Sequence, residues 1–227
     1  MATVPHPPRS ALLAGATGLV GRELLPLLLA NPRYTRVQVL VRPSSSVIKP
    51  HAKLKVQTVD YRDLPADLPH IDDVYVALGT TIRTAGSNEA FREVDFDFVL
   101  ASARAARAAG AQRIAVVSAI GADSNSRVFY NRVKGDMQTA IASIGFETVV
   151  LAQPSLLLGD RAALGQPTRQ GEVWATRLLG PVMGLVPKAV RPIQAGAVAR
   201  AMIDATLAGQ RGVRILASAD MLGALPH

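Results

Sequence analysis

Three side chains in this sequence combine the groups that the reduction of a carbonyl requires. Tyr130 and Lys134 lie four residues apart in "VFYNRVKG" (128–135), so on a helix they would share one face, about 5–6 Å apart. Ser118 lies upstream, at the end of an apolar segment. These residues are consistent with a proton-transfer site. The alternative is that Tyr130 packs in the fold and Lys134 is a solvated surface residue.

The chemistry assigns a different task to each of these side chains. Carbonyl reduction needs a hydride on one side and a proton for the developing alkoxide on the other, and a free tyrosine with a pKa of about 10 is a weak acid for this. A nearby ammonium group and a helix N-terminus stabilise a phenolate and lower such a pKa. Tyr130 is therefore the candidate acid/base, Lys134 its activator, and Ser118 the group that hydrogen-bonds the substrate oxygen. The polar segment 122–126, "ADSNS", is expected to cap a helix that starts just before Tyr130.

A glycine-rich turn supplies a candidate cofactor site. "GATGLVG" (15–21) directly follows a short apolar strand and opens a helix. Gly15 allows a tight turn, Gly18 allows a pyrophosphate to approach the backbone, and Gly21 allows the helix to pack closely on the strand. The helix N-terminus offers N–H groups and partial positive charge to phosphates. No lysine followed by Ser or Thr completes a nucleoside-triphosphate loop, so a dinucleotide is favoured.

The residue after the second predicted strand favours NADP(H) over NAD(H). NAD-preferring folds place a carboxylate there, about 20 residues past the glycines, to bind the ribose hydroxyls. This chain instead has Arg42, followed by Pro43 and three serines, within a segment between Glu23 and Asp60 that contains no acidic residue. A guanidinium group matches the 2′-phosphate of NADPH. The alternative for Arg42 is a solvated loop arginine.

Alternating apolar and helical segments predict a Rossmann-type, doubly wound parallel sheet with helices on both faces. Apolar strands are expected at 10–14, 36–41, 54–59, 73–78, 112–118 and 146–152, and helices at 18–30, 88–109 and 127–144. Ligands in such sheets bind beyond the carboxyl ends of the strands.

The chain is expected to form one NAD(P)-binding domain over residues 10–227, after a Pro-rich tail at 1–9. Within it, 10–153 would be the nucleotide-binding core and 154–227 would supply elements that cover the substrate. That second part has an irregular segment rich in Gly, Pro, Arg and Gln, then a short helix, a longer helix and a last strand at 159–171, 172–180, 194–209 and 213–217, respectively.

Composition argues against several other classes of protein. The chain has no cysteine, which removes disulfides and thiolate metal sites and favours a cytoplasmic location. Its four histidines show no ligand spacing, so no metal is expected. The net charge of +8 comes without basic clusters interleaved with aromatics, so nucleic acid is not the expected partner. No segment has the length of a membrane span. The expected partner is a small-molecule substrate, and a homodimer remains an open alternative.

The sequence resembles the atypical short-chain dehydrogenase/reductases, through "GATGLVG", Asp60, Ser118 and "YNRVK". Within them it is similar to the HIV Tat-interactive protein-like oxidoreductases and their bacterial relatives. This similarity rests on "ALGTTIRTAGS" (77–87), "FREVDFDFVL" (91–100), "SAIGADSNSRVFYNRVKGDM" (118–137) and "GEVWATRLLG" (171–180).

The resemblance implies a set of cofactor contacts. The nucleotide site would contain Gly15, Thr17, Gly18, Leu19, Val20, Gly21 and Arg42, with Asp60 near the adenine and Leu78, Gly79 and Thr80 beside the cofactor. Lys134 would also bind the nicotinamide ribose, and Pro154 and Ser155 would flank the carboxamide. The chain departs from the family pattern in two ways: Gln153 replaces an arginine common in relatives, and no asparagine supplies the usual fourth catalytic member.

Two hypotheses of different class follow from the sequence. The first is an NADPH-dependent oxidoreductase acting on a small carbonyl or alcohol, with Tyr130 as acid/base. The second is an NADP(H)-binding regulatory or redox-sensing protein with little turnover, because a fold does not fix a function. The presence of Ser118, Tyr130 and Lys134 together favours the enzyme, since a protein that only binds has no need of the tyrosine.

Overall fold

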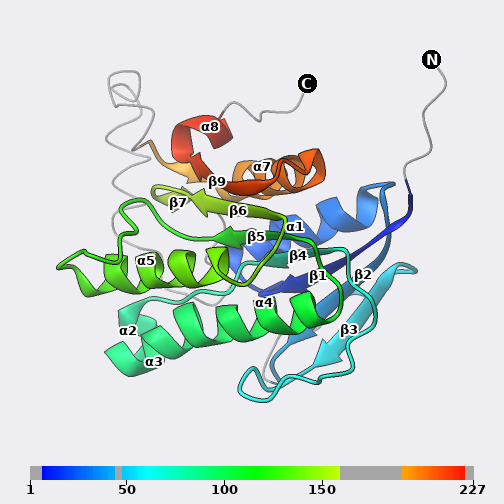
Figure 1. Ribbon diagram of the computed structural model, residues 1–227, viewed down its shortest axis with the longest axis horizontal. Coiled ribbons are helices and arrows are strands. Elements are labelled where there is room, and N and C mark those ends of the chain that lie inside the picture. The colour runs from blue at the N-terminus through cyan, green and yellow to red at the C-terminus, as the bar shows by residue number, and fades with distance from the viewer. Residues whose placement is uncertain (1–6, 44–47, 159–190, 223–227) are drawn as a thin grey trace.

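The computed structural model describes residues 7–43, 48–158 and 191–222. Seven strands of these residues form one parallel sheet in the order β3-β2-β1-β4-β5-β6-β9. The predicted Rossmann-type fold is confirmed, with helices on both faces of the sheet (Figure 1). The strands are β1 (Arg9–Ala14), β2 (Tyr34–Val41), β3 (Leu54–Thr58), β4 (Asp73–Val76), β5 (Arg113–Val117), β6 (Thr148–Gln153) and β9 (Gly212–Ala217).

The helices cover the sheet in two layers. On one face lie α1 (Leu19–Ala30) and α7 (Ala195–Ala208), and on the other lie α4 (Phe98–Ala108) and α5 (Phe129–Ala142) (Figure 1). Smaller elements complete the described chain, some of which the sequence pattern did not indicate. These are α2 (Ile82–Ala85), α3 (Asn88–Arg92), the π-helix η1 (Glu93–Asp97), α8 (Ser218–Leu222) and the two-stranded pair β7 (Leu157–Leu158) and β8 (Ile193–Gln194).

The apolar strands are explained by burial on both faces. In β1, Ala11 and Leu13 join the apolar cluster under α1 and α7, whereas Leu12 and Ala14 join the cluster under α4 and α5. All four are fully buried. A strand covered on both sides reads as a continuous apolar run, as expected for parallel sheets. The strand order reverses between β1 and β4, which makes the carboxyl ends of these two strands the expected ligand position.

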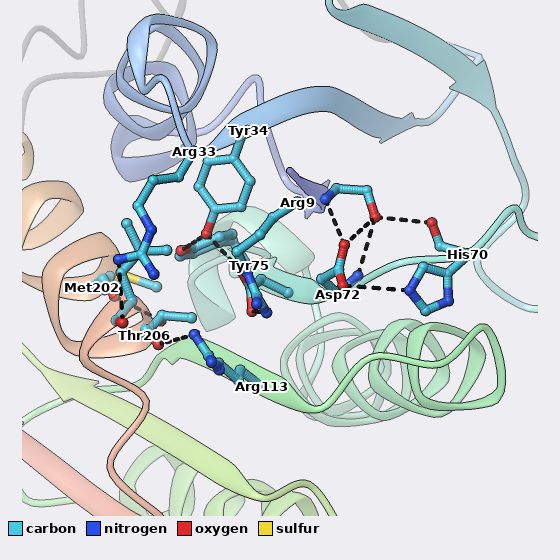
Figure 2. Close-up of polar contacts among 12 residues, drawn as sticks. Arg9, Arg33, Tyr34, His70, Asp72, Tyr75, Arg113, Met202 and Thr206 are labelled. Carbon is cyan, nitrogen blue, oxygen red and sulfur yellow. Dashed lines mark hydrogen bonds and ion pairs between the residues drawn. The ribbon is translucent and has the colours of Figure 1, made fainter. Parts of the chain in front are cut away.

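A buried polar network joins the amino ends of three strands (Figure 2). Arg9 at the start of β1 donates two hydrogen bonds of 2.7 Å to Asp73 at the start of β4. The Tyr34 hydroxyl, at the start of β2, donates to Asp73 at 2.8 Å and lies 2.7 Å from the Tyr75 hydroxyl. Burial raises the pKa of Tyr34 and of Tyr75 above the ordinary tyrosine value. The network thus ties β1, β2 and β4 together at the edge opposite their carboxyl ends.

Candidate active site

The glycines of the turn after β1 differ in what the fold demands of them. Gly15 has a φ of +90°, and a Cβ there would lie 2.5 Å from the Ala77 carbonyl carbon. A Cβ on Gly21 would lie 2.0 Å from the Gly15 carbonyl oxygen. A Cβ on Gly18 would find its nearest neighbour at 3.4 Å, an ordinary contact. Gly15 and Gly21 are therefore required by the fold itself, whereas a methyl group on Gly18 would meet its neighbours at ordinary contact distances.

A groove runs along the carboxyl ends of the strands in three sections that share lining residues. The middle section, of about 120 Å³, contains Gly15, Thr17, Gly18 and Arg42. It shares Gly18, Leu78 and Gly79 with one end section of about 200 Å³ and shares Arg42, Tyr61 and Gly79 with the other end section of about 600 Å³. The predicted residues Leu19, Val20, Thr80, Ser118, Tyr130, Lys134, Pro154 and Ser155 line the 200 Å³ section.

Four of the predicted site residues directly follow strand ends. Gly15 comes after β1, Arg42 after β2, Ser118 after β5 and Pro154 after β6. Because these strands are parallel and adjacent, the residues after their carboxyl ends meet at one edge of the sheet. Gly21 is different, because it packs against Gly15 beneath the turn and is not among the residues that line the three sections.

The helix that opens at the turn offers its N-terminus to the groove. Gly18 is the N-cap residue of α1, no side chain caps it, and the first turn contains no acidic residue. This uncapped helix N-terminus suits a phosphate group. The residues present therefore fit a dinucleotide whose pyrophosphate lies over Gly18.

Residues after β2 and β3 line the 600 Å³ section together with residues from α2, α3, η1 and α4. Arg42, and Asp60, which the family resemblance implies near the adenine, both line it. Asp60 also has a local structural task, because its Oδ1 accepts a hydrogen bond from the backbone N–H of Arg62 at 2.9 Å. The Arg62 guanidinium pairs with both carboxylate oxygens of Glu93 at 2.7 and 3.0 Å. The three serines at 44–46 lie outside the described residues.

Tyr61 lines this section and also belongs to the apolar cluster under α4 and α5. Its ionisation makes the stability of the fold depend on pH. Its buried hydroxyl donates to the Leu40 carbonyl at 2.9 Å. Burial raises the pKa of Tyr61 to about 12, against a smaller lowering effect of Arg42. The folded state favours the neutral phenol. The contribution of Tyr61 to the free energy of unfolding is therefore complete below about pH 10 and is lost as pH rises through about 12.

We therefore expect the free energy of unfolding to fall as pH rises above 10, with a shallower fall in Tyr61→Phe. Phenylalanine keeps the ring and cannot ionise. Denaturant unfolding at a series of pH values from 8 to 11.5 measures the difference. Equal slopes for both proteins would contradict the role of Tyr61, because Tyr34 and Tyr75 titrate in both.

The catalytic candidates come together in the 200 Å³ section. The helix α5 begins at Phe129, so Tyr130 lies in its first turn and Lys134 one turn later. The Tyr130 ring packs against Phe91 with centroids 5.3 Å apart. The predicted cap from 122–126 is wrong, because the N-cap residue is Val128 and no side chain caps the helix. Ser126 instead accepts from the Val128 N–H at 3.2 Å.

The loop before α5 packs against the helix through a glycine. A Cβ on Gly135 would lie 2.1 Å from the backbone nitrogen of Ser124, so only glycine fits there. The Asp123 N–H donates to the Asn131 carbonyl at 3.0 Å. These contacts hold the loop after β5 against the helix that carries Tyr130.

A buried carboxylate that the sequence did not reveal contacts the candidate lysine. The Lys134 ammonium lies 2.7 Å from Asp95 Oδ1, and both side chains are almost fully buried. Asp95 Oδ2 accepts from the Thr80 N–H at 2.8 Å. The π-helix η1 places Asp95 here, and such helices are rare and often found at functional sites. Asp95 lies in "FREVDFDF", where Glu93 and Asp97 are also acidic, so its charge did not distinguish it from its neighbours.

Ser118 is linked to two glutamines behind it. The Gln138 amide nitrogen donates to Ser118 Oγ at 2.6 Å, and the Gln153 amide nitrogen donates to Gln138 Oε1 at 3.2 Å. Gln153 thus contacts Ser118 indirectly, through Gln138. Ser155 is fixed as well, because its N–H donates to Ser218 Oγ at 2.6 Å and its hydroxyl to the Arg191 carbonyl.

The remaining expectations concern the C-terminal segments, metal sites and membrane spans. The predicted irregular segment 159–171 and helix 172–180 lie outside the described residues. Residues 194–209 and 213–217 form α7 and β9. Among the residues described, no three His, Asp or Glu side chains are grouped as a metal site would require. No helix in this part of the chain has the length and apolar character to cross a membrane. The division at residue 153 and the homodimer remain predictions.

A comparison with family models decides the family. The model described as NAD(P)H-binding matches residues 15–152, from the glycine turn to the end of β6. The chain belongs to the NAD(P)H-binding family. The match supports a nicotinamide cofactor, whereas it does not determine the choice between NADP and NAD.

Curated relatives of this NAD(P)H-binding protein include fungal FMP52 proteins. Protein fmp52 of Emericella nidulans is 36% identical over 156 residues, which cover 66% of this chain and 67% of that protein. The Aspergillus fumigatus protein is 32% identical over 205 residues, which cover 86% of each. These relatives are named FMP52 proteins, so they support the NAD(P)H-binding family and do not specifically support the Tat-interactive group that the motifs resemble. Both are named mitochondrial.

The expected cytoplasmic location is contradicted by these names. That expectation rested on the lack of cysteine, which excludes reliance on disulfides but does not distinguish one reducing compartment from another. Among solved structures, a UDP-N-acetylglucosamine 4-epimerase from Methanobrevibacter ruminantium superposes with a TM-score of 0.69 at 14% identity, covering 93% of this chain and 77% of the epimerase. At that identity the likeness concerns the fold.

Proposed function

We propose that this NAD(P)H-binding protein is an NADPH-dependent oxidoreductase of the atypical short-chain dehydrogenase type. It would transfer hydride to or from a small-molecule carbonyl or alcohol. The observation that carries the proposal is the shared lining of one groove section by Ser118, Tyr130 and Lys134, beside the glycine turn. The motif resemblance to the Tat-interactive group supports the same activity.

The adenosine end supports NADP(H) as the cofactor. Arg42 lies at the boundary between the middle and 600 Å³ sections, where the 2′-phosphate of a dinucleotide over Gly18 would lie. The carboxylate nearby, Asp60, comes from the loop after β3 and is engaged with the Arg62 N–H. A guanidinium group at this position favours a phosphate over free ribose hydroxyls.

The nicotinamide end supports proton transfer by Tyr130. NADPH, when bound, would supply the hydride. The Ser118 hydroxyl would hold the substrate oxygen, and the Tyr130 hydroxyl would donate its proton to that oxygen as charge develops there. Lys134, paired with Asp95, would place its ammonium group in the same groove section as the Tyr130 hydroxyl. Burial of the ion pair fixes the ammonium position before the ligands bind.

Titration with NADPH and NADH tests the cofactor assignment. In Arg42→Gln we expect NADPH affinity to fall about 10- to 100-fold, the loss typical of a charge-assisted hydrogen bond, with NADH affinity nearly unchanged. Arg104→Gln is the matched control, because Arg104 is exposed on α4 and outside the groove lining. Fluorescence or thermal shift measures both nucleotides. Equal affinity of the unmodified protein for NADPH and NADH would contradict the role of Arg42, and binding of neither would refute the proposal.

A further inference from the structure

The hydrogen bonds behind Ser118 determine which way its hydroxyl can point. A serine hydroxyl has one hydrogen to donate, whereas an amide NH₂ group can only donate. Because the Gln138 amide nitrogen lies 2.6 Å from Ser118 Oγ, the serine oxygen accepts this bond and keeps its own hydrogen for another partner. Ser118 lines the 200 Å³ section, so that hydrogen is available to an oxygen atom bound there.

The orientation of the Gln138 amide is set in turn by Gln153. The Gln153 amide nitrogen donates to Gln138 Oε1 at 3.2 Å, so Gln138 presents its oxygen to Gln153 and its NH₂ group to Ser118. A reversed Gln138 amide would place two NH₂ groups face to face and leave the serine hydroxyl bonded to the amide oxygen. Gln138 and Gln153 come from α5 and β6, and neither is among the residues lining the 200 Å³ section. They can act on a ligand there only through Ser118.

We propose that Gln138, oriented by Gln153, is a positioning residue that makes Ser118 a hydrogen-bond donor to the substrate oxygen. The inference rests on the proposed oxidoreductase function and extends it to a pair of residues outside the groove. A donor aimed at the substrate oxygen before the reaction stabilises the charge that develops there, which a hydroxyl engaged elsewhere cannot do. The pair also gives Gln153 a function, because its amide N–H holds Gln138 Oε1.

Two substitutions of Gln138 separate this role from a structural one. In Gln138→Glu the carboxylate can accept from both Gln153 and Ser118, so both hydrogen bonds persist, but the serine hydrogen is taken away from the substrate. In Gln138→Met both bonds are lost, but the serine hydrogen stays available. A positioning role therefore predicts that the glutamate variant is less active than the methionine variant. A purely structural role predicts the reverse order.

Steady-state reduction of 9,10-phenanthrenequinone by NADPH, with other quinones, aldehydes and ketones as further probes, measures the order. We expect kcat to fall about 100-fold in Gln138→Glu at neutral pH, the size of a lost oxyanion donor, and clearly less in Gln138→Met. Gln153→Leu frees the Gln138 amide to reverse. Its kcat should lie between that of the unmodified protein and that of Gln138→Glu. Thermal melts should show Gln138→Glu to be at least as stable as Gln138→Met.

The pH profile adds a readout that packing does not affect. Below the pKa of the introduced carboxyl group, its O–H can donate to Ser118 and restore the original direction of the bond. The ratio of Gln138→Glu to unmodified activity should therefore rise as pH falls from 8 to 5.5. Tyr130 and Lys134 on the same helix, and Asp95 from η1, act in both proteins, so the ratio isolates the new carboxyl group.

The possible failures are distinguishable. Turnover by the unmodified protein, with Gln138→Glu as active as Gln138→Met or more so, or with a ratio independent of pH, would overturn the positioning role and leave the oxidoreductase intact. No reduction of any carbonyl probe by a protein that binds NADPH would overturn the proposed activity and this role with it. The expected order, together with the pH-dependent ratio, would support both.

Discussion

Replacing Tyr130 by phenylalanine is expected to lower turnover of a carbonyl substrate by about 10²- to 10⁴-fold, the usual contribution of a general acid. The affinity for NADPH should change less than about twofold, because the ring contact with Phe91 does not involve the hydroxyl. Steady-state kinetics with a carbonyl substrate and a separate NADPH titration measure the two quantities. Their separation is the signature of a group that acts in the chemical step and not in cofactor binding.

The matched control is Tyr75→Phe, the same change at the opposite edge of the sheet. That substitution removes a buried hydroxyl 2.7 Å from Tyr34, so it should lower the melting temperature and leave turnover per folded molecule unchanged. Full activity in Tyr130→Phe would refute the acid/base assignment. Cofactor-dependent binding of another protein that persists in Tyr130→Phe, without turnover in either form, would favour the regulatory hypothesis.

Replacing Gly21 by alanine is expected to cost at least about 3 kcal/mol of unfolding free energy, or to prevent folding. The added methyl carbon would lie 2.0 Å from the Gly15 carbonyl oxygen, and the neighbouring atoms are backbone that cannot rotate away. Removing this steric clash would require α1 to move away from β1, which lies inside the sheet between β2 and β4. Denaturant unfolding measures the loss. A stable Gly21→Ala protein would contradict the close packing of turn and helix.

Gly18→Ala is the partner experiment and should give the opposite pattern. Its methyl group has only ordinary contacts, so the unfolding free energy should drop by about 1 kcal/mol or less, as for an N-cap change. The same methyl group would occupy the space over which a pyrophosphate must lie, so NADPH affinity should fall tenfold or more. Unchanged NADPH affinity in Gly18→Ala would contradict the placement of the phosphates over this turn.

The sequence allowed the fold to be predicted because parallel strands buried on both faces leave continuous apolar runs. The strands expected at 10–14 and 36–41 occur as β1 and β2, with boundaries shifted by one or two residues. The residues that follow strand ends could also be placed, since parallel topology brings Gly15, Arg42 and Ser118 to one edge. Local sequence patterns were sufficient wherever the spacing of apolar residues identified a helix or a strand.

Contacts between distant segments were not predictable in this way. Asp95 meets Lys134 across 39 positions of sequence, and a π-helical turn, which has no clear sequence signature, directs it there. The Gln138 and Gln153 amides join a helix to a strand through side-chain orientation alone. The cap expected from 122–126 failed because the polar residues there serve the turns of the loop, as in the Asn125 N–H bond to Asp123. The predicted cytoplasmic location was wrong because the lack of cysteine indicates a reducing environment but does not identify the compartment.

The network of Arg9, Tyr34, Asp73 and Tyr75 has a consequence for how this protein could change over time. It fastens the sheet at the amino ends of the strands, whereas the groove lies at the carboxyl ends. Substitutions that reshape the groove therefore leave this anchor untouched, so new substrates could be acquired without first losing the scaffold. The same separation gives protein engineers two independent regions, one to strengthen and the other to diversify.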